Sequence, residues 1–177
     1  MRQSLRRDRE FSEGERARAL AFLVVGISSA GLGFLAVLHL EGASVFDGIS
    51  TYQLWIIAAS ALGGLAALFL SGDRMGQAGV AGALRGVAGA IWVTFIGAVI
   101  GGTLSLPLYG TMFGPFIVCV TLLGAPLLAL LWATNLIAVH ILMGVYQRER
   151  DSIFAVADSK PVDPNDSLTA RLRGRLV

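Results

Sequence analysis

Side chains able to take part in chemistry are scarce in this sequence, and most of them stand inside long apolar stretches. A polar or ionisable side chain in such a stretch is costly to bury and is a functional candidate by default. We single out Asn135 and His140 for this reason. They are five residues apart, so on a helix their side chains point about 140° apart and do not converge on one site. Further candidates are Thr121, Thr134, Ser28 and Ser29.

The two histidines, His39 and His140, invite comparison with the axial ligands of a haem. Bis-histidine ligation needs both rings at the same depth. By the topology derived below, His39 ends a helix running outward, whereas His140 lies late in a helix running inward. The two rings are expected near opposite membrane faces, so we expect no haem and no other cofactor.

No pattern typical of an enzyme active site stands out. The glycine-rich stretch 76–82 lacks the Gly-Lys-Ser/Thr ending of a phosphate-binding loop and follows no buried strand. The apolar stretches hold no aspartate pair and no acidic cluster for a divalent metal. The single cysteine, Cys119, excludes an internal disulfide and is expected to be a small buried hydrophobe. We therefore predict a non-enzymatic protein without a metal site.

Four apolar stretches carry these side chains. Of the 177 residues, 55% are hydrophobic and only 15% are charged, against about 25% charged in soluble domains. A helix needs about 20 apolar residues to cross a bilayer core of about 30 Å, and residues 19–40, 52–70, 86–106 and 113–146 meet this need. The last stretch contains Pro126 and is expected to form one tilted or kinked helix. The sequence predicts an all-α integral membrane protein folded as a four-helix bundle.

The basic residues predict the orientation of this bundle. Six arginines precede residue 19, Arg74 and Arg85 lie between the second and third stretches, and six basic residues follow residue 146. Together they are all 14 lysines and arginines of the chain, and the other two connections have none. Basic residues favour the cytoplasmic side, so both termini are predicted to be cytoplasmic. This also explains the net charge of +2 without a nucleic-acid partner.

A cleavable signal peptide is the alternative interpretation of the first apolar stretch. An apolar stretch of about 20 residues exceeds the usual 7–15, and no convincing A-x-A site follows it, so we favour an uncleaved span. One lysine against thirteen arginines, with abundant glycine and alanine, is typical of GC-rich bacterial genomes. We therefore expect a bacterial inner membrane protein.

Small residues recur at four-residue spacing in the third stretch, where they form a strip that lets another helix approach closely. We favour packing within one bundle; an oligomer interface is the alternative. The residues expected to pack are Gly82, Gly86, Ala90, Thr94, Ala98 and Gly102, with Gly97 and Gly101 in a second row and Gly63 in the second stretch.

The two ends of the chain are expected to be cytoplasmic. Residues 1–18 form a basic arm of mixed charge, and residues 147–177 form a tail that two prolines divide. Residues 167–177 fit a short basic amphipathic segment, in which Arg171, Arg173 and Arg175 would contact anionic lipid or a partner. A disordered tail is the alternative.

The favoured function is that of a non-enzymatic accessory, assembly or scaffolding subunit of a larger membrane complex. Its partners would be the bilayer and another membrane protein, or further copies of the chain. One alternative is a small homo-oligomeric transporter or channel, with Thr94, Thr103, Asn135 and His140 along its path. The other is a haem-binding membrane anchor.

Cysteine labelling tests the predicted orientation. In a Cys119→Ala background, we expect a membrane-impermeant maleimide to reach Asp47→Cys from outside the cell and Lys160→Cys only after the membrane is opened. The reason is that all basic residues fall in alternate connections. The parent Cys119→Ala chain, which has no thiol, is the control. The reverse pattern of labelling would overturn the orientation.

Overall fold

The computed structural model describes residues 11–41 and 48–157, and this part of the chain is helical, without strands. Its elements are α2 (Glu13–Glu41), α3 (Thr51–Ser71), the short 3-10 helix η1 (Gly72–Arg74), α4 (Gly79–Ser105), α5 (Gly110–Gly124) and α6 (Pro126–Ala157). The prediction of an all-helical fold is confirmed. Four stretches within these helices are long and apolar enough to cross a membrane: Glu13–Leu38, Thr51–Arg74, Gly79–Ser105 and Pro126–Ser152.

Hydrogen-bonded caps set where the first two helices begin. Before α2, the backbone N–H of Glu15 donates to Ser12 Oγ (3.2 Å), and the backbone N–H of Ser12 donates to the Glu15 carboxylate (3.1 Å). Ser50 and Gln53 form the same reciprocal pair before α3. Each pair satisfies two backbone groups that a helix start would otherwise leave without partners. This is why α2 begins at residue 13, ahead of the apolar stretch predicted from residue 19.

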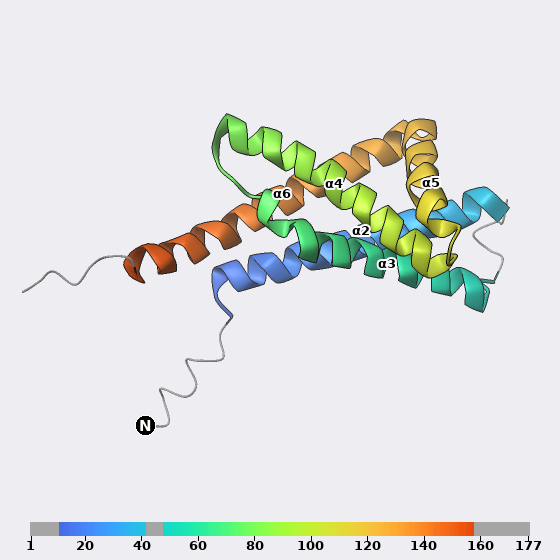
Figure 1. Ribbon diagram of the computed structural model, residues 1–177, viewed down its shortest axis with the longest axis horizontal. Coiled ribbons are helices and arrows are strands. Elements are labelled where there is room, and N and C mark those ends of the chain that lie inside the picture. Colours follow the sequence, from blue (N-terminus) through green and yellow to red (C-terminus); the bar gives the residue numbers. More distant parts are fainter. Residues whose placement is uncertain (1–10, 42–47, 158–177) are drawn as a thin grey trace, which may run out of the picture.

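The long helices run roughly side by side (Figure 1). Helix α3 packs against both α2 and α4, and α2 also packs against α6, whereas α4 and α6 make little backbone contact. The described chain begins and ends at the same end of the bundle (Figure 1). An even number of long antiparallel helices requires this arrangement.

The fourth apolar stretch differs from the prediction of one kinked helix over 113–146. It forms two helices, α5 and α6, separated at Ala125. The residue before a proline is sterically disfavoured in the helical region, and Ala125 has φ −133° and ψ 89°. Pro126 then begins α6, where its missing N–H costs nothing. Helix α5 therefore leaves the direction of α6 and runs steeply across one end of the bundle (Figure 1).

Helices α3 and α4 touch backbone to backbone. A Cβ atom added to Gly63 would lie 2.5 Å from the carbonyl oxygen of Gly97 and 2.6 Å from the backbone nitrogen of Gly101. Only a residue without a side chain allows this approach. Close approach gains many weak dispersion contacts, each worth about 0.1–0.2 kcal/mol.

We predict that Gly63→Ala lowers the thermal stability of the detergent-solubilised protein. The added methyl group would have to push apart two backbones, and overpacking of this kind typically costs about 1–3 kcal/mol. The control is Gly31→Ala in α2, where an added Cβ meets nothing within 4 Å. That change should be neutral or stabilising by up to about 1 kcal/mol, because alanine favours helix. Equal melting temperatures for the two variants would contradict the close contact.

Candidate functional site

The small residues of α4 are divided among several neighbours within the chain. Gly97 and Gly101 face α3, where their neighbours include the backbone of Gly63. Nearer the end of α4, Gly102 lies against Gly110, and Ala98 lies against Gly114, both of α5. The backbone of Gln77 closes on Gly82, and Ala90 packs against the hydrophobic core.

His140 lies against Gly86 and holds the turn that precedes α4. A Cβ atom on Gly86 would lie 2.5 Å from Cε1 of the His140 ring. Nδ1 of His140 accepts a hydrogen bond from the backbone N–H of Gly76 (3.0 Å). Gly76 has φ +92°, a conformation that glycine adopts readily and other residues avoid. His140 therefore has a structural contact here, and no metal-binding group of three His, Cys, Asp or Glu occurs among the described residues.

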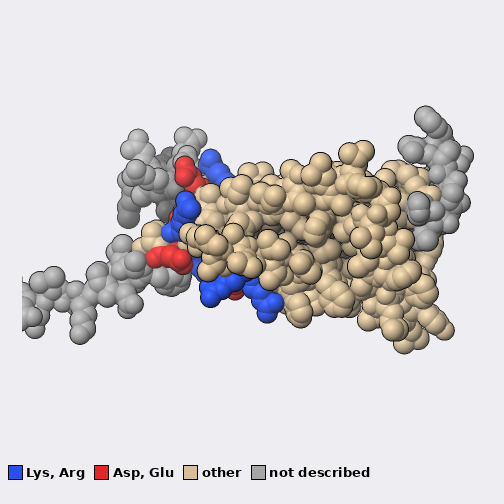
Figure 2. Space-filling view, turned by 90° about the horizontal axis from the view of Figure 1, so that it is seen from above, with Lys and Arg blue, Asp and Glu red and all other residues tan. Residues whose placement is uncertain are grey.

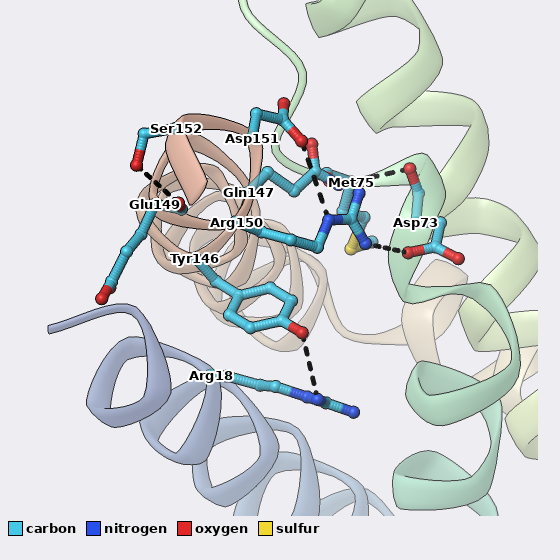
Figure 3. A network of polar contacts seen from close by, with 9 residues as sticks. All are labelled: Arg18, Asp73, Met75, Tyr146, Gln147, Glu149, Arg150, Asp151 and Ser152. Atoms are coloured by element: carbon cyan, nitrogen blue, oxygen red, sulfur yellow. Dashed lines mark hydrogen bonds and ion pairs between the residues drawn. The ribbon is translucent and has the colours of Figure 1, made fainter. Parts of the chain in front are cut away.

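Gln147 and Arg150 of α6 also hold this turn (Figure 3). The buried amide of Gln147 donates to the carbonyl oxygens of Met75 (2.5 Å) and Asp73 (3.3 Å). The guanidinium of Arg150 lies 3.2 Å from the Asp73 carboxylate. That carboxylate is 87% exposed, so the ion pair contributes at most about 1 kcal/mol. The buried amide is the stronger constraint on the turn.

The charged side chains of the described residues gather at this end of the bundle, beside a long uncharged body (Figure 2). Aromatic rings hold part of the cluster in place. The guanidinium of Arg18 lies 5.1 Å from the centre of the Tyr146 ring and donates to its hydroxyl (3.2 Å) (Figure 3). The guanidinium of Arg74 lies 5.1 Å from the centre of the Trp92 ring. A cation over an aromatic face gains about 0.5–1 kcal/mol at exposed sites.

A cavity of about 210 Å³, called the lumen below, lies among α2, α3, α4, α5 and α6. Along α2 it extends from Val25 to Val37, which is about 18 Å at 1.5 Å per residue. Its walls are mainly apolar, and many are built from glycine and alanine. The lumen is partly open to its surroundings, because its lining includes Leu106 and Phe113, which are 47% and 54% exposed. A ligand can therefore enter it.

One end of the lumen is closed by the hydrophobic core. Val25, Val93 and Val139 line this end and are 6%, 3% and 0% exposed. They pack with Met75 and Met143, which separate the lumen from the charged end. Within the described residues, the lumen therefore ends at this core and does not reach the charged end.

Polar side chains lie near the closed end. The indole N–H of Trp132 donates to Thr94 Oγ1 (3.1 Å), and the Thr94 hydroxyl donates to the carbonyl oxygen of Ala90 (2.8 Å). Asn135 also lines the lumen, and its Nδ2 donates to the carbonyl oxygen of Leu131 (2.9 Å). Further polar lining residues are Ser28, Ser29, Ser60, Ser105 and Thr121.

The structure brings together only part of the transport path proposed from the sequence. Thr94 and Asn135 line the lumen, but Thr103 and His140 do not. The Thr103 hydroxyl pairs with that of Thr111 (3.0 Å). The side chain of His39, the segment 167–177 and its Arg171, Arg173 and Arg175 fall outside the described residues.

No family model, curated protein or solved structure matches this chain. The site is therefore interpreted from its own geometry.

The sequence predicted neither the lumen nor the hydrogen bonds from α6 to the turn before α4. A local signal existed for the helix break, since Gly124 and Ala125 precede Pro126. The roles of Trp132 and Gln147 had no such signal, because both depend on contacts with α4 or with residues 73–75.

A double-mutant cycle tests the contact between Gly86 and His140. We expect Gly86→Ala to destabilise the protein in detergent, because the new methyl group would strike the imidazole ring. In a His140→Ala background the ring is gone, so the same change should cost less. Direct contacts of this kind give coupling energies of about 0.5–3 kcal/mol. Additive effects of the two changes on unfolding free energy would contradict the contact.

Proposed function

We propose that this chain is a non-enzymatic subunit of a larger membrane complex. It spans the inner membrane of a bacterium four times, with both termini in the cytoplasm. The four long apolar helices and the gathering of charge at one end support insertion in this orientation. The charged end then lies at the cytoplasmic surface, and α5 lies near the opposite face.

The observation that carries a subunit role is an exposed face of α4. Ala81, Leu84, Ala88, Ile91 and Phe95 are all exposed and alternate at spacings of three and four residues. Side chains at this spacing share one face of a helix, and two helices that pack with a left-handed crossing meet along such a face. The alanines at seven-residue spacing leave room for a close approach, which drives helix association in lipid. The occupant we propose is a membrane-spanning helix of a different protein.

The homo-oligomeric transporter is the second candidate, and the lumen is the observation in its favour. Two features weigh against it. The glycine rows that would join the copies already face α3 and α5 within the chain, and the core closes the lumen toward the charged end. The haem anchor has less support, since Nδ1 of His140 already accepts from Gly76.

Native mass spectrometry of the protein extracted gently from its own membrane tests the subunit role. We expect a stoichiometric complex with a different chain, and we expect Ala88→Trp to reduce it at least tenfold by holding the two helices apart. The matched control is Ala58→Trp on α3, which replaces another exposed alanine and should leave the complex intact.

The other outcomes of this experiment are equally informative. Complexes made only of this chain would favour the transporter, and a bound haem would favour the anchor. A monomer in mild extraction, or equal loss of the partner in both tryptophan variants, would overturn the proposed role of α4.

A further inference from the structure

The lumen presents unused hydrogen-bonding groups near its closed end. Nδ2 of Asn135 donates to its own helix, which turns Oδ1 away, and within the described residues this oxygen has no donor. The hydroxyl of Ser28 likewise has no hydrogen-bond partner in the described part of the chain, whereas Ser29 Oγ lies against Gly64 of α3. Polar groups facing an apolar cavity are costly unless they find partners. The lumen thus offers the Asn135 oxygen and the Ser28 hydroxyl to whatever fills it.

These groups lie at a similar depth in the bundle. Arg18 of α2 contacts Tyr146 of α6, which fixes the register of the two antiparallel helices. Ser28 is ten residues beyond Arg18, and Asn135 is eleven residues before Tyr146. At the same rise per residue, Ser28 and Asn135 reach the same level. Both residues line the lumen, and we call them its polar patch.

The rest of the lining restricts the ligand to an uncharged molecule. None of the residues that line the lumen is Asp, Glu, Lys, Arg or His. A charged head group would be buried without a counter-charge, which is far more costly than burying a neutral hydroxyl. From the polar patch toward the other end, the walls include Ala36, Leu106 and Phe113. An apolar chain therefore fits along this part of the lumen.

We propose that the lumen binds a long-chain alcohol, with its hydroxyl at the polar patch and its chain directed toward α5. The hydroxyl donates to Oδ1 of Asn135 and accepts from Ser28. The chain fills the apolar part of the lumen. A phospholipid acyl chain fits less well, because its methyl end would face the polar patch and leave those groups without partners. This inference goes beyond the proposed subunit role and does not depend on it.

The fluorescence of Trp132 reports ligand binding, because its indole lines the lumen. The experiment uses the full chain in detergent with Trp55→Phe and Trp92→Phe, which leaves Trp132 as the only tryptophan. Titration with ω-bromodecanol, whose bromine quenches indole fluorescence at short range, should give saturable quenching. A chain that keeps only Trp92, which is 44% exposed and outside the lumen, reports simple partition into the micelle.

Head-group chemistry is tested with bromodecane and bromodecanoate under the same conditions. Both should bind at least tenfold more weakly than the alcohol, since one offers no hydrogen bond and the other brings a charge. Asn135→Leu should weaken alcohol binding about tenfold and leave bromodecane binding unchanged, because a single unmade hydrogen bond has about that effect. Within the described residues the Asn135 side chain bonds only to its own helix, so no bond between helices is lost.

A variant with a larger side chain inside the lumen tests whether the alcohol binds there. Ser28→Phe should abolish saturable quenching by occupying the lumen, whereas Ile27→Phe, at a 65% exposed position on the outside of α2, should leave it unchanged. The proposal is overturned if Trp132 and Trp92 are quenched alike without saturation, which is the result for a lumen holding only water. It is also overturned if bromodecane binds as tightly as the alcohol, or if Ser28→Phe binds like the parent.

Discussion

The steric restriction at Ala125 decides how the interior of this protein is filled. A residue before proline avoids the helical region, so the fourth apolar stretch cannot continue as one helix. Of the two helices that this stretch forms, α5 crosses one end of the bundle and α6 runs along the bundle (Figure 1). Helix α4 packs against α3 and α5, and α6 packs against α2, so α4 and α6 make little backbone contact and meet mainly through side chains. The lumen lies in the interior that these pairings leave open.

Two kinds of contact hold the frame around the lumen. In one, backbones meet where glycine removes the side chain, as between Gly63 and Gly101. In the other, side chains of α6 hold the turn between η1 and α4, through the ring of His140 and the amide of Gln147. Neither contact depends on the exclusion of water, because one rests on dispersion and the other on hydrogen bonds. Such contacts are the ones available to helices surrounded by lipid.

The two polar regions of the molecule are chemically different and are kept apart. One end carries the charged side chains, arranged around aromatic rings and the turn before α4. The lumen is uncharged, and its polar side chains are six hydroxyls, one amide and the indole of Trp132. The valines and methionines of the core separate them. The charged end and the lumen therefore differ in the kind of molecule that each can bind.

Hydrophobicity and local sterics determined what the sequence alone could predict. Four long apolar helices follow from composition and length, and Gly63, Gly97 and Gly101 were identified from spacing as sites of close packing. The sequence could not predict which neighbours such residues contact. In the first row of small residues of α4, Gly86 lies against a histidine of α6 and Gly102 against the start of α5. The lumen was also decided by the tertiary structure alone. A cavity is the space that several helices fail to fill, so it depends on their relative placement, whereas hydrophobicity is a property of each segment by itself.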